Sequence, residues 1–525
     1  MGKTNRTKNS IINFVTGFGG YLITVFLHFF VRTVFIHTLG KEYLGINGLF
    51  TNILSMLSLA ELGIGAAIVY RLYKPLAEKD AQRVRMLVKF YRLAYRCIGF
   101  TILILGLLFI PFLPVLIKDY ESLSTLGINA VLLFLLFLSN TVSSYLFLAY
   151  RSTVVVADQK RYIVDLVNNS MQIARTILQI IVLYLFRNFI IYTLVAVVSS
   201  IAASIINGII AKKKYPLYFQ PEESSLSKTE IKEMLQDCGA LFVYKVNAVV
   251  VKASDNLVLS AFIGLAAVGL YSNYLLIYRT CRTLINKVFI AFRASMGDLF
   301  ATENLESKYR FFRIANFLSA FLFGTAGVGV AVCANEVVET WLGSGYVLAQ
   351  PVPILIAIEL FFAGIVVCLG QVRGVSGVFR QAWYRPLLGI IVNIVVSVVL
   401  VQFWGISGVI IGTITSYVLT NFLIEPALIY KYAFNNVRPL SEYYKANLMY
   451  LLVCAAVAAA DLFICSHVFV GHGWFSVIVH VLITGLSVPS AFLVLFWKTE
   501  ECRYLVNSAL RIFRKVFHKY LAKRG

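Results

Sequence analysis

The sequence predicts an all-α polytopic membrane protein with about 14 transmembrane helices. Of its 525 residues, 59% are hydrophobic and only 14% are charged, whereas soluble domains average about 25% charged residues. The apolar residues form roughly fourteen stretches, each near the length that crosses a bilayer as a helix. The third observation is that lysine and arginine are concentrated in alternate gaps between these stretches.

These alternate gaps set the expected topology. They hold 35 of the 47 Lys and Arg residues, whereas the opposite gaps hold only Lys41, Lys118 and Arg187. By the positive-inside rule both termini are expected in the cytoplasm. A net charge of +22 would suggest nucleic acid in a soluble protein, but here it is explained by topology, and no nucleic-acid partner is expected. The eight cysteines contain no CxxC pair, so neither disulfides nor a metal site nor another cofactor is predicted.

The fourteen expected spans follow one another with short outward links and longer, basic inward loops. They are 10–35, 45–70, 93–117, 126–149, 162–186, 189–211, 238–263, 265–290, 311–334, 348–370, 384–403, 407–430, 446–469 and 475–497.

The longest inward loop divides the chain after six spans, and Ser227 to Glu230 within it has the pattern of a capping box that opens the next helix. Six further spans and a final pair follow. The predicted parts are an N-lobe at 1–211, a linker at 212–235, a C-lobe at 236–430, a helix pair at 431–497 and an amphipathic tail at 498–525.

A short internal sequence repeat accompanies this division. Leu39-Gly40-x-x-x-Leu44-Gly45-Ile46 is echoed by Ile263-Gly264-x-x-x-Val268-Gly269-Leu270 at the equivalent outward link of the second half. An even number of spans per half would relate the halves by an axis along the membrane normal.

Residues 81–92 and the tail have amphipathic patterns, and we expect both to lie on the inner leaflet.

Nine basic residues lie within the spans. Arg96, Lys287 and Arg313 are near inner ends and can snorkel, and Arg32 is equally compatible with snorkelling or a polar interior. A basic side chain at mid-membrane costs about 2.5–3.5 kcal/mol on insertion scales, so the remaining five are expected to face a polar interior. These five are Arg175, Lys245, Lys252, Arg279 and Arg282.

Four of these five cations should share one level of the membrane. Counted from the turn at Gly264, Lys245, Lys252, Arg279 and Arg282 lie about 18–29 Å deep at the rise of an α-helix. Such a layer suits a multiply charged anion such as a diphosphate. The alternative is internal salt bridging, because Asp255 lies three residues from Lys252.

A polar stripe on the fifth span predicts a water-lined face. Its members recur at helical spacing, and polar residues in a bilayer must line water or polar protein. A weaker polar line runs along the first span from Asn13 to Arg32, so both could border a central cavity. The predicted cavity-lining residues of the fifth span are Asn168, Asn169, Gln172 and Gln179, beside Asp165, Arg175 and Thr176.

Acidic residues within the spans have two possible roles. Glu61, Asp165 and Asp255 could carry a proton or sodium ion in a transporter. Each could instead be a local charge partner, as could Glu359, Glu425 and Asp461.

Two segments resemble a known family. The second span ends Leu57-Ser-Leu-Ala-Glu61-Leu-Gly63-Ile-Gly65, and the seventh and eighth contain Ser254-Asp255-Asn256 and Gly269-Leu-Tyr271-Ser-Asn273-Tyr274. Both resemble the polysaccharide repeat-unit flippases (Wzx-type) of the multidrug/oligosaccharidyl-lipid/polysaccharide exporter superfamily, abbreviated MOP.

The resemblance implies a MATE- and MurJ-like fold of two six-helix lobes in a V with a C-terminal helix pair. It implies translocation of an undecaprenyl-diphosphate-linked oligosaccharide, a capsule or exopolysaccharide repeat unit, across a bacterial cytoplasmic membrane by alternating access. Partners would be membrane lipids and the glycan polymerase and glycosyltransferases of the pathway. Related lipid II flippases place arginines on spans one, two and eight around the diphosphate. Arg32 and either Arg279 or Arg282 match two of these, but span two has no mid-membrane arginine.

Three other functions are weighed against this one. A lipid II flippase would have the same fold. An ion-coupled multidrug or cation antiporter should have an acidic or aromatic cavity, which the basic layer opposes. A membrane enzyme such as a polymerase or glycosyltransferase usually needs a large outward loop or a DxD motif, and neither is present. We therefore expect no catalytic residues.

Overall fold

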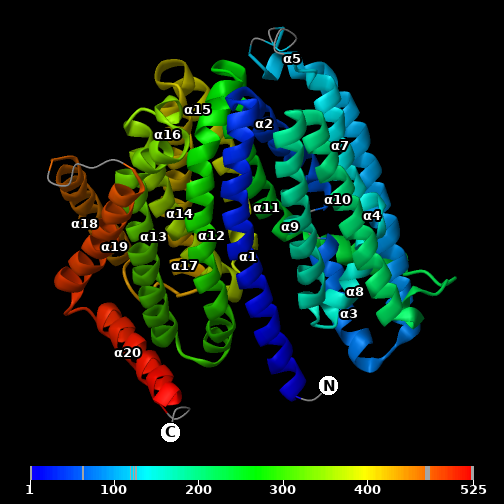
Figure 1. Cartoon of the computed structure of the whole chain (residues 1–525). Coiled ribbons are helices and arrows are strands. Elements are labelled where there is room, and N and C mark those ends of the chain that lie inside the picture. The colour runs from blue at the N-terminus through cyan, green and yellow to red at the C-terminus, as the bar shows by residue number, and fades with distance from the viewer. Residues whose placement is uncertain are drawn as a thin grey trace. The chain divides into compact units, whose positions relative to one another are not determined.

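A computed structural model describes most of the chain (Figure 1). Outside the description lie residues 1–2, 62–63, 119, 122, 124–126, 468–472 and 522–525, together with the side chains of 3–18, 21–22, 60, 64, 66–67, 235–242, 244–245, 248, 291–295, 380 and 512–521. The described part is helical and contains no strand. This confirms the predicted all-α class.

Ten helical segments of the described part are long and apolar enough to cross a membrane, which makes the chain a multi-pass membrane protein. The other expected spans coincide with α1, with the pair α2 and α3, with α11 and with α12, so the count of 14 stays a prediction. The ten segments are Ala81–Leu116 (α4, α5), Ala130–Ala157 (α7, α8), Arg161–Phe186 (α9), Phe189–Lys214 (α10), Leu305–Leu342 (α13), Pro351–Ser376 (α14), Tyr384–Trp404 (α15), Ile406–Tyr432 (α16, α17), Leu440–His467 (α18) and Trp474–Phe496 (α19).

The remaining helices show how the chain turns. α1 (Lys3–Leu39) is followed by α2 (Lys41–Leu57) at Gly40, whose φ is 94°. α11 (Lys228–Phe262) is followed by α12 (Leu265–Thr302) at Gly264, whose φ is 123°. Both turns need the left-handed backbone that glycine adopts without strain. The helix α11 begins with the predicted capping box, in which Ser227 and Glu230 each bond the other's backbone N–H.

The second expected span is interrupted. α2 ends at Leu57, a 3₁₀ turn covers Ser58–Glu61, and α3 begins at Ile64. The sequence prediction treated residues 45–70 as one helix. The interruption places Glu61 at the end of the tight turn.

The chain forms two compact units, Met1–Gly269 and Leu270–Gly525. α11 belongs to the first because it packs on α2 and α3, and Lys118 donates from its backbone N–H to the Ser260 carbonyl at 3.1 Å. This division differs from the predicted lobe boundary at 212–235. The predicted lobes, the helix pair and the tail remain predictions.

The two echoed glycine motifs pack on each other inside the first unit. A Cβ on Gly45 would lie 2.0 Å from the Leu265 carbonyl oxygen, and a Cβ on Gly269 would lie 2.2 Å from the Lys41 carbonyl oxygen. Gly45 therefore meets Leu265, four residues before Gly269, and Gly269 meets Lys41, four residues before Gly45. This reciprocal contact brings the start of α2 close to the start of α12.

Residues 81–92 do not form the separate surface-lying helix that their amphipathic pattern predicted. These residues form the first turns of α4, and Val84, Leu87 and Tyr91 are buried in a core cluster with residues of α3 and α8. Their apolar side chains pack inside the protein because α3, the 3₁₀ turn at Leu148–Arg151 and the linker cover them.

The second unit has a large aromatic core. Phe312, Tyr430, Phe434 and Tyr443 pack edge-on, tilted or stacked, with centroids 5.3–6.2 Å apart. α18 and α19 pack on α13, followed by the tail helix α20 (Glu500–Leu521) (Figure 1). Its first turn is joined to α13 by ion pairs from Arg310 to Glu500 and from Arg313 to Glu501.

Candidate functional site

A polar face in the first unit brings together cationic residues of two packed helices. α1 lies along α9, and a Cβ on Gly20 would lie 2.0 Å from the side-chain nitrogen of Asn169. Glycine at this position lets the polar stripe of α9 approach α1. One turn further along α9, the Gln172 amide lies 3.3 Å from His28 Nε2 of α1.

Two arginines lie at this face. Arg32 and Arg175 both interact electrostatically with His28 and with the Tyr192 hydroxyl. The Arg175 side chain is half-buried, and its Nε is a buried donor with no hydrogen-bond partner. An unsatisfied buried donor on a charged group is costly. We name His28, Arg32, Gln172 and Arg175 the first-unit cationic face.

The rest of the α9 stripe is engaged within the unit. Asn207 of α10 donates to the Asn168 side chain at 3.0 Å. Gln179 is 2% exposed and donates to the Tyr192 carbonyl at 3.2 Å, and so it packs between helices. Asp165 lies 3.5 Å from Arg161, four residues earlier. Gln179 and Asp165 therefore already have protein partners.

The four predicted cations of spans seven and eight are placed differently from one another. Lys252 and Arg279 are exposed, while the side chain of Lys245 lies outside the described residues. Arg282 donates to the Tyr278 hydroxyl at 3.0 Å and interacts with Tyr417 and Glu359.

Arg282 thus has a carboxylate nearby inside its own unit, in the way that the salt-bridge alternative expected. Asp255, near Lys252 in sequence, is 7% exposed. The predicted single layer of four cations draws on both compact units and stays a prediction.

Glu61 is held by tyrosines from two helices. Tyr95 of α4 donates to one carboxylate oxygen at 2.6 Å, and Tyr145 of α7 donates to the other at 2.7 Å. Each oxygen of the Glu61 carboxyl group thus accepts one tyrosine hydrogen bond. The interrupted second span is therefore tied to α4 and α7 through one side chain.

The sequence predicted Glu425 as a possible local charge partner, but it did not predict the buried network that Glu425 forms in the second unit. Glu425, 1% exposed, pairs with Arg373 and lies 3.2 Å from Arg385. Arg385 also donates to the Asn421 side chain. The two arginines were counted as topological charges of an inward loop. Glu425 lies 52 residues after Arg373 and 40 after Arg385 in the sequence, so no local signal reveals the network.

A second missed cluster joins the C-terminal helices to α13. His480 Nδ1 lies 2.5 Å from a Glu336 carboxylate oxygen, and Ser487 donates to Asp461 at 2.6 Å. Asp461 is among the acids that the sequence places within the membrane, whereas His480 and Glu336 are not among the predicted site residues. Among the described residues no group of three His, Cys, Asp or Glu side chains is arranged to hold a metal ion.

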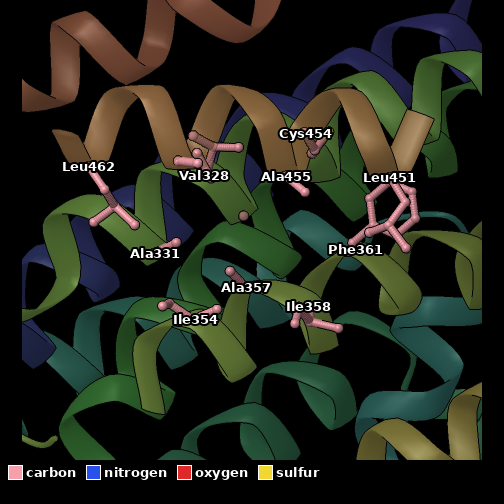
Figure 2. A pocket seen from close by; sticks show the side chains of 14 residues that line it. Val328, Ala331, Ile354, Ala357, Ile358, Phe361, Leu451, Cys454, Ala455 and Leu462 are labelled. Carbon is pink, nitrogen blue, oxygen red and sulfur yellow. The ribbon is translucent and has the colours of Figure 1, made fainter. Parts of the chain in front are cut away.

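An apolar pocket of about 260 Å³ lies between α13, α14 and α18. Figure 2 shows Ala455 and Leu462 of α18 facing Ala331 and Ala357 across it. Its lining contains no charged side chain, so this pocket offers no partner for an anion.

The family is shown by the first part of the chain. Residues 8–293 match the family described as "Polysaccharide biosynthesis protein". The chain belongs to this family. The resemblance predicted from the second, seventh and eighth spans is thereby confirmed. The comparison with curated proteins found no match.

Solved structures show the fold of this polysaccharide biosynthesis family member. It is similar to "Lipid II flippase MurJ, inward closed conformation" at a TM-score of 0.66 and 14% identity, covering 91% of this chain and 98% of that one. An inward-facing multidrug resistance MATE family transporter of the MOP superfamily gives 0.57 at 14% identity, with 79% and 96% covered. A point mutant of the Vibrio cholerae MATE transporter VcmN gives 0.52 at 16%, with 83% and 99% covered. The predicted MATE- and MurJ-like fold is confirmed.

Proposed function

We propose that this protein is a flippase that translocates an undecaprenyl-diphosphate-linked oligosaccharide, a capsule or exopolysaccharide repeat unit, across the bacterial cytoplasmic membrane by alternating access. The observation that carries the proposal is the first-unit cationic face. It combines two arginines, a histidine and a glutamine on helices of a membrane protein that belongs to a polysaccharide biosynthesis family.

The chemistry of this face fits a diphosphate. A guanidinium can donate two parallel hydrogen bonds to phosphate oxygens, and the unsatisfied Nε of Arg175 is a donor in need of an acceptor. Gln172 and Asn169 add neutral donors along the same side of α9, suited to sugar hydroxyls. Lys252 is a further proposed ligand, and it is exposed on α11.

The competing antiporter function predicts the opposite charge. A cavity for cationic drugs needs carboxylates or aromatic faces toward the ligand, whereas Glu61 and Asp165 of the first unit already have protein partners. No bond is broken in translocation, and so no catalytic residue is proposed.

The proposal is tested with the full chain in liposomes that contain a fluorescent undecaprenyl-diphosphate oligosaccharide. Substituting Arg175→Gln removes one charge-assisted phosphate contact, worth about 1.5–3 kcal/mol. The expected result is at least about tenfold weaker substrate binding and correspondingly slower translocation at low substrate concentration. Runs with and without proton and sodium gradients identify any coupling ion.

Arg187→Gln is the matched control, because Arg187 is the exposed residue that follows the same helix. It removes the same charge outside the cationic face, so translocation should stay at the wild-type rate. Equal rates for the two variants would remove Arg175 from the site. Transport of an organic cation without movement of the labelled lipid would replace the flippase by the antiporter.

A further inference from the structure

We infer that the basic end of α4 and the linker beside it form a binding site for an anionic phospholipid. A pocket of about 360 Å³ lies there. Lys89, Arg92 and Arg96 of α4 line one side, and Ser225, Leu226 and Ile231 line the other. All of these residues belong to the first unit, and none belongs to the first-unit cationic face.

The three cations and an apolar strip share one face of α4. Positions 89, 92 and 96 are three and four apart, so their side chains lie on one side of the helix. Leu93, Phe100 and Ile104 continue this side toward the other end, and they are 62%, 54% and 57% exposed. A phosphate headgroup on the cations would place its acyl chains along these apolar side chains.

The cations lie at the level of a headgroup. Arg96 is the last charged residue before Cys97–Leu116, a stretch with no charged side chain. About 20 apolar helical residues span the hydrocarbon core. Arg92 and Arg96 therefore lie where the hydrocarbon ends, and basic pockets at this level bind anionic lipid headgroups.

Neighbouring basic residues are already engaged, whereas these two arginines are not. Arg83 pairs with Glu230, Arg85 lies 2.9 Å from Glu222, and Lys89 donates to the Glu222 carbonyl at 2.8 Å. Among the residues that the structure describes, Arg92 and Arg96 have no hydrogen bond or ion pair. The pocket therefore presents two uncompensated positive charges beside Leu226, which is buried.

These features select a phospholipid from among possible anions. A soluble phosphate would use the arginines but not the exposed apolar strip, whereas a phospholipid uses both. The linker supplies the opposite wall of the pocket, so a bound lipid stabilises the linker in its docked position. Phosphatidylglycerol has the required single negative phosphate and two acyl chains.

The experiment is a titration of the full chain by native mass spectrometry with phosphatidylglycerol and, separately, phosphatidylcholine. The wild type should bind phosphatidylglycerol more tightly. Arg92 and Arg96 line the pocket, and a hydrogen bond to a charged group contributes about 1.5–3 kcal/mol, so the double variant R92Q/R96Q should bind phosphatidylglycerol at least about tenfold more weakly. Its binding of phosphatidylcholine should not change.

The matched control is K212Q/K213Q, which removes two exposed charges from the end of α10 and should bind like wild type. Equal losses in both double variants would overturn the site, as would binding of inorganic phosphate that matches phosphatidylglycerol. A third outcome would also overturn it. If undecaprenyl diphosphate displaced phosphatidylglycerol and R92Q/R96Q lost translocation, the pocket would belong to the transported substrate.

A second variant tests the site with both arginines in place. Leu93→Trp puts a fluorophore beside the pocket, and brominated phosphatidylglycerol should quench its added emission more than brominated phosphatidylcholine at the same bilayer fraction. Equal quenching by the two lipids would contradict the inference.

Discussion

The partners of Arg175 and Arg282 are known only from the folded chain. The sequence predicts that both lie within the membrane, because each is surrounded by apolar residues. It does not predict that Arg282 interacts with Glu359 and Tyr417, since these partners come from helices far along the chain. Arg175 instead has a buried Nε with no partner. The depth of a charge follows from local sequence, and its partner depends on tertiary packing.

The structure leaves no room for a side chain at Gly45. Gly45→Val would drive a side chain into the Leu265 carbonyl, and overpacking of this kind costs about 1–3 kcal/mol. We expect a lower thermal unfolding temperature in detergent. The control is Gly19→Val, because a Cβ on Gly19 meets no atom within 4 Å. Similar unfolding temperatures for both variants would contradict the close approach of α2 and α12.

At the scale of elements, the linker is held to α4 through charges. Arg83 lowers the pKa of Glu230 to about 2 from its ordinary 4.5, helped by the Ser227 backbone N–H. Arg85 lowers the pKa of Glu222. A carboxyl with a lowered folded-state pKa stabilises the docked linker above its ordinary pKa, and this contribution is lost as the pH falls through the folded-state value.

The linker should therefore undock between about pH 4.5 and pH 2. Pepsin is active across this range and the linker contains Leu217 and Phe219, so its cleavage rate, normalised to an unstructured peptide, should rise as the pH falls. The double variant E222Q/E230Q lacks both titrating groups and should be cleaved at one normalised rate throughout. A wild-type rate that does not change with pH would rule out charge-dependent docking.

Some elements were predictable and others were not. The capping box at Ser227 is local, and the structure confirms it. The amphipathic pattern of 81–92 was read as a membrane-surface helix, but the same pattern also fits a helix packed on a protein core, and Val84 and Tyr91 are buried there. The break after Leu57 was missed because residues 45–70 are mostly apolar, and Glu61 gains its two tyrosine partners from distant helices.

At the scale of the whole molecule, the alternate placement of basic residues predicts which ends of the helices face the cytoplasm. Arg187 precedes α10 (Phe189–Lys214) and Lys212 lies in its last turn, and the helix rises about 35 Å from Phe189 to Lys212. In a variant without the native cysteines, R187C should react with an impermeant maleimide in intact cells, and K212C only after permeabilisation. The reverse pattern would invert the topology.

Composition and charge placement were sufficient for the membrane class, because hydrophobic length and basic loops are properties of the linear sequence. The family's fold was implied instead by the resemblance of the segments around Glu61, Asp255 and Tyr271. The division at Gly269 was not predictable from composition or charge placement. It depends on α11 packing against α2 and α3, and on the glycines that allow this approach.

The reciprocal approach of Gly45 to Leu265 and of Gly269 to Lys41 constrains how this chain can evolve. What each glycine meets is a main-chain oxygen, which every amino acid at position 41 or 265 would carry. A smaller residue at position 41 or 265 therefore cannot make room for a bulkier residue at either glycine. Glycine should be retained at position 45 and at position 269, each for its own contact.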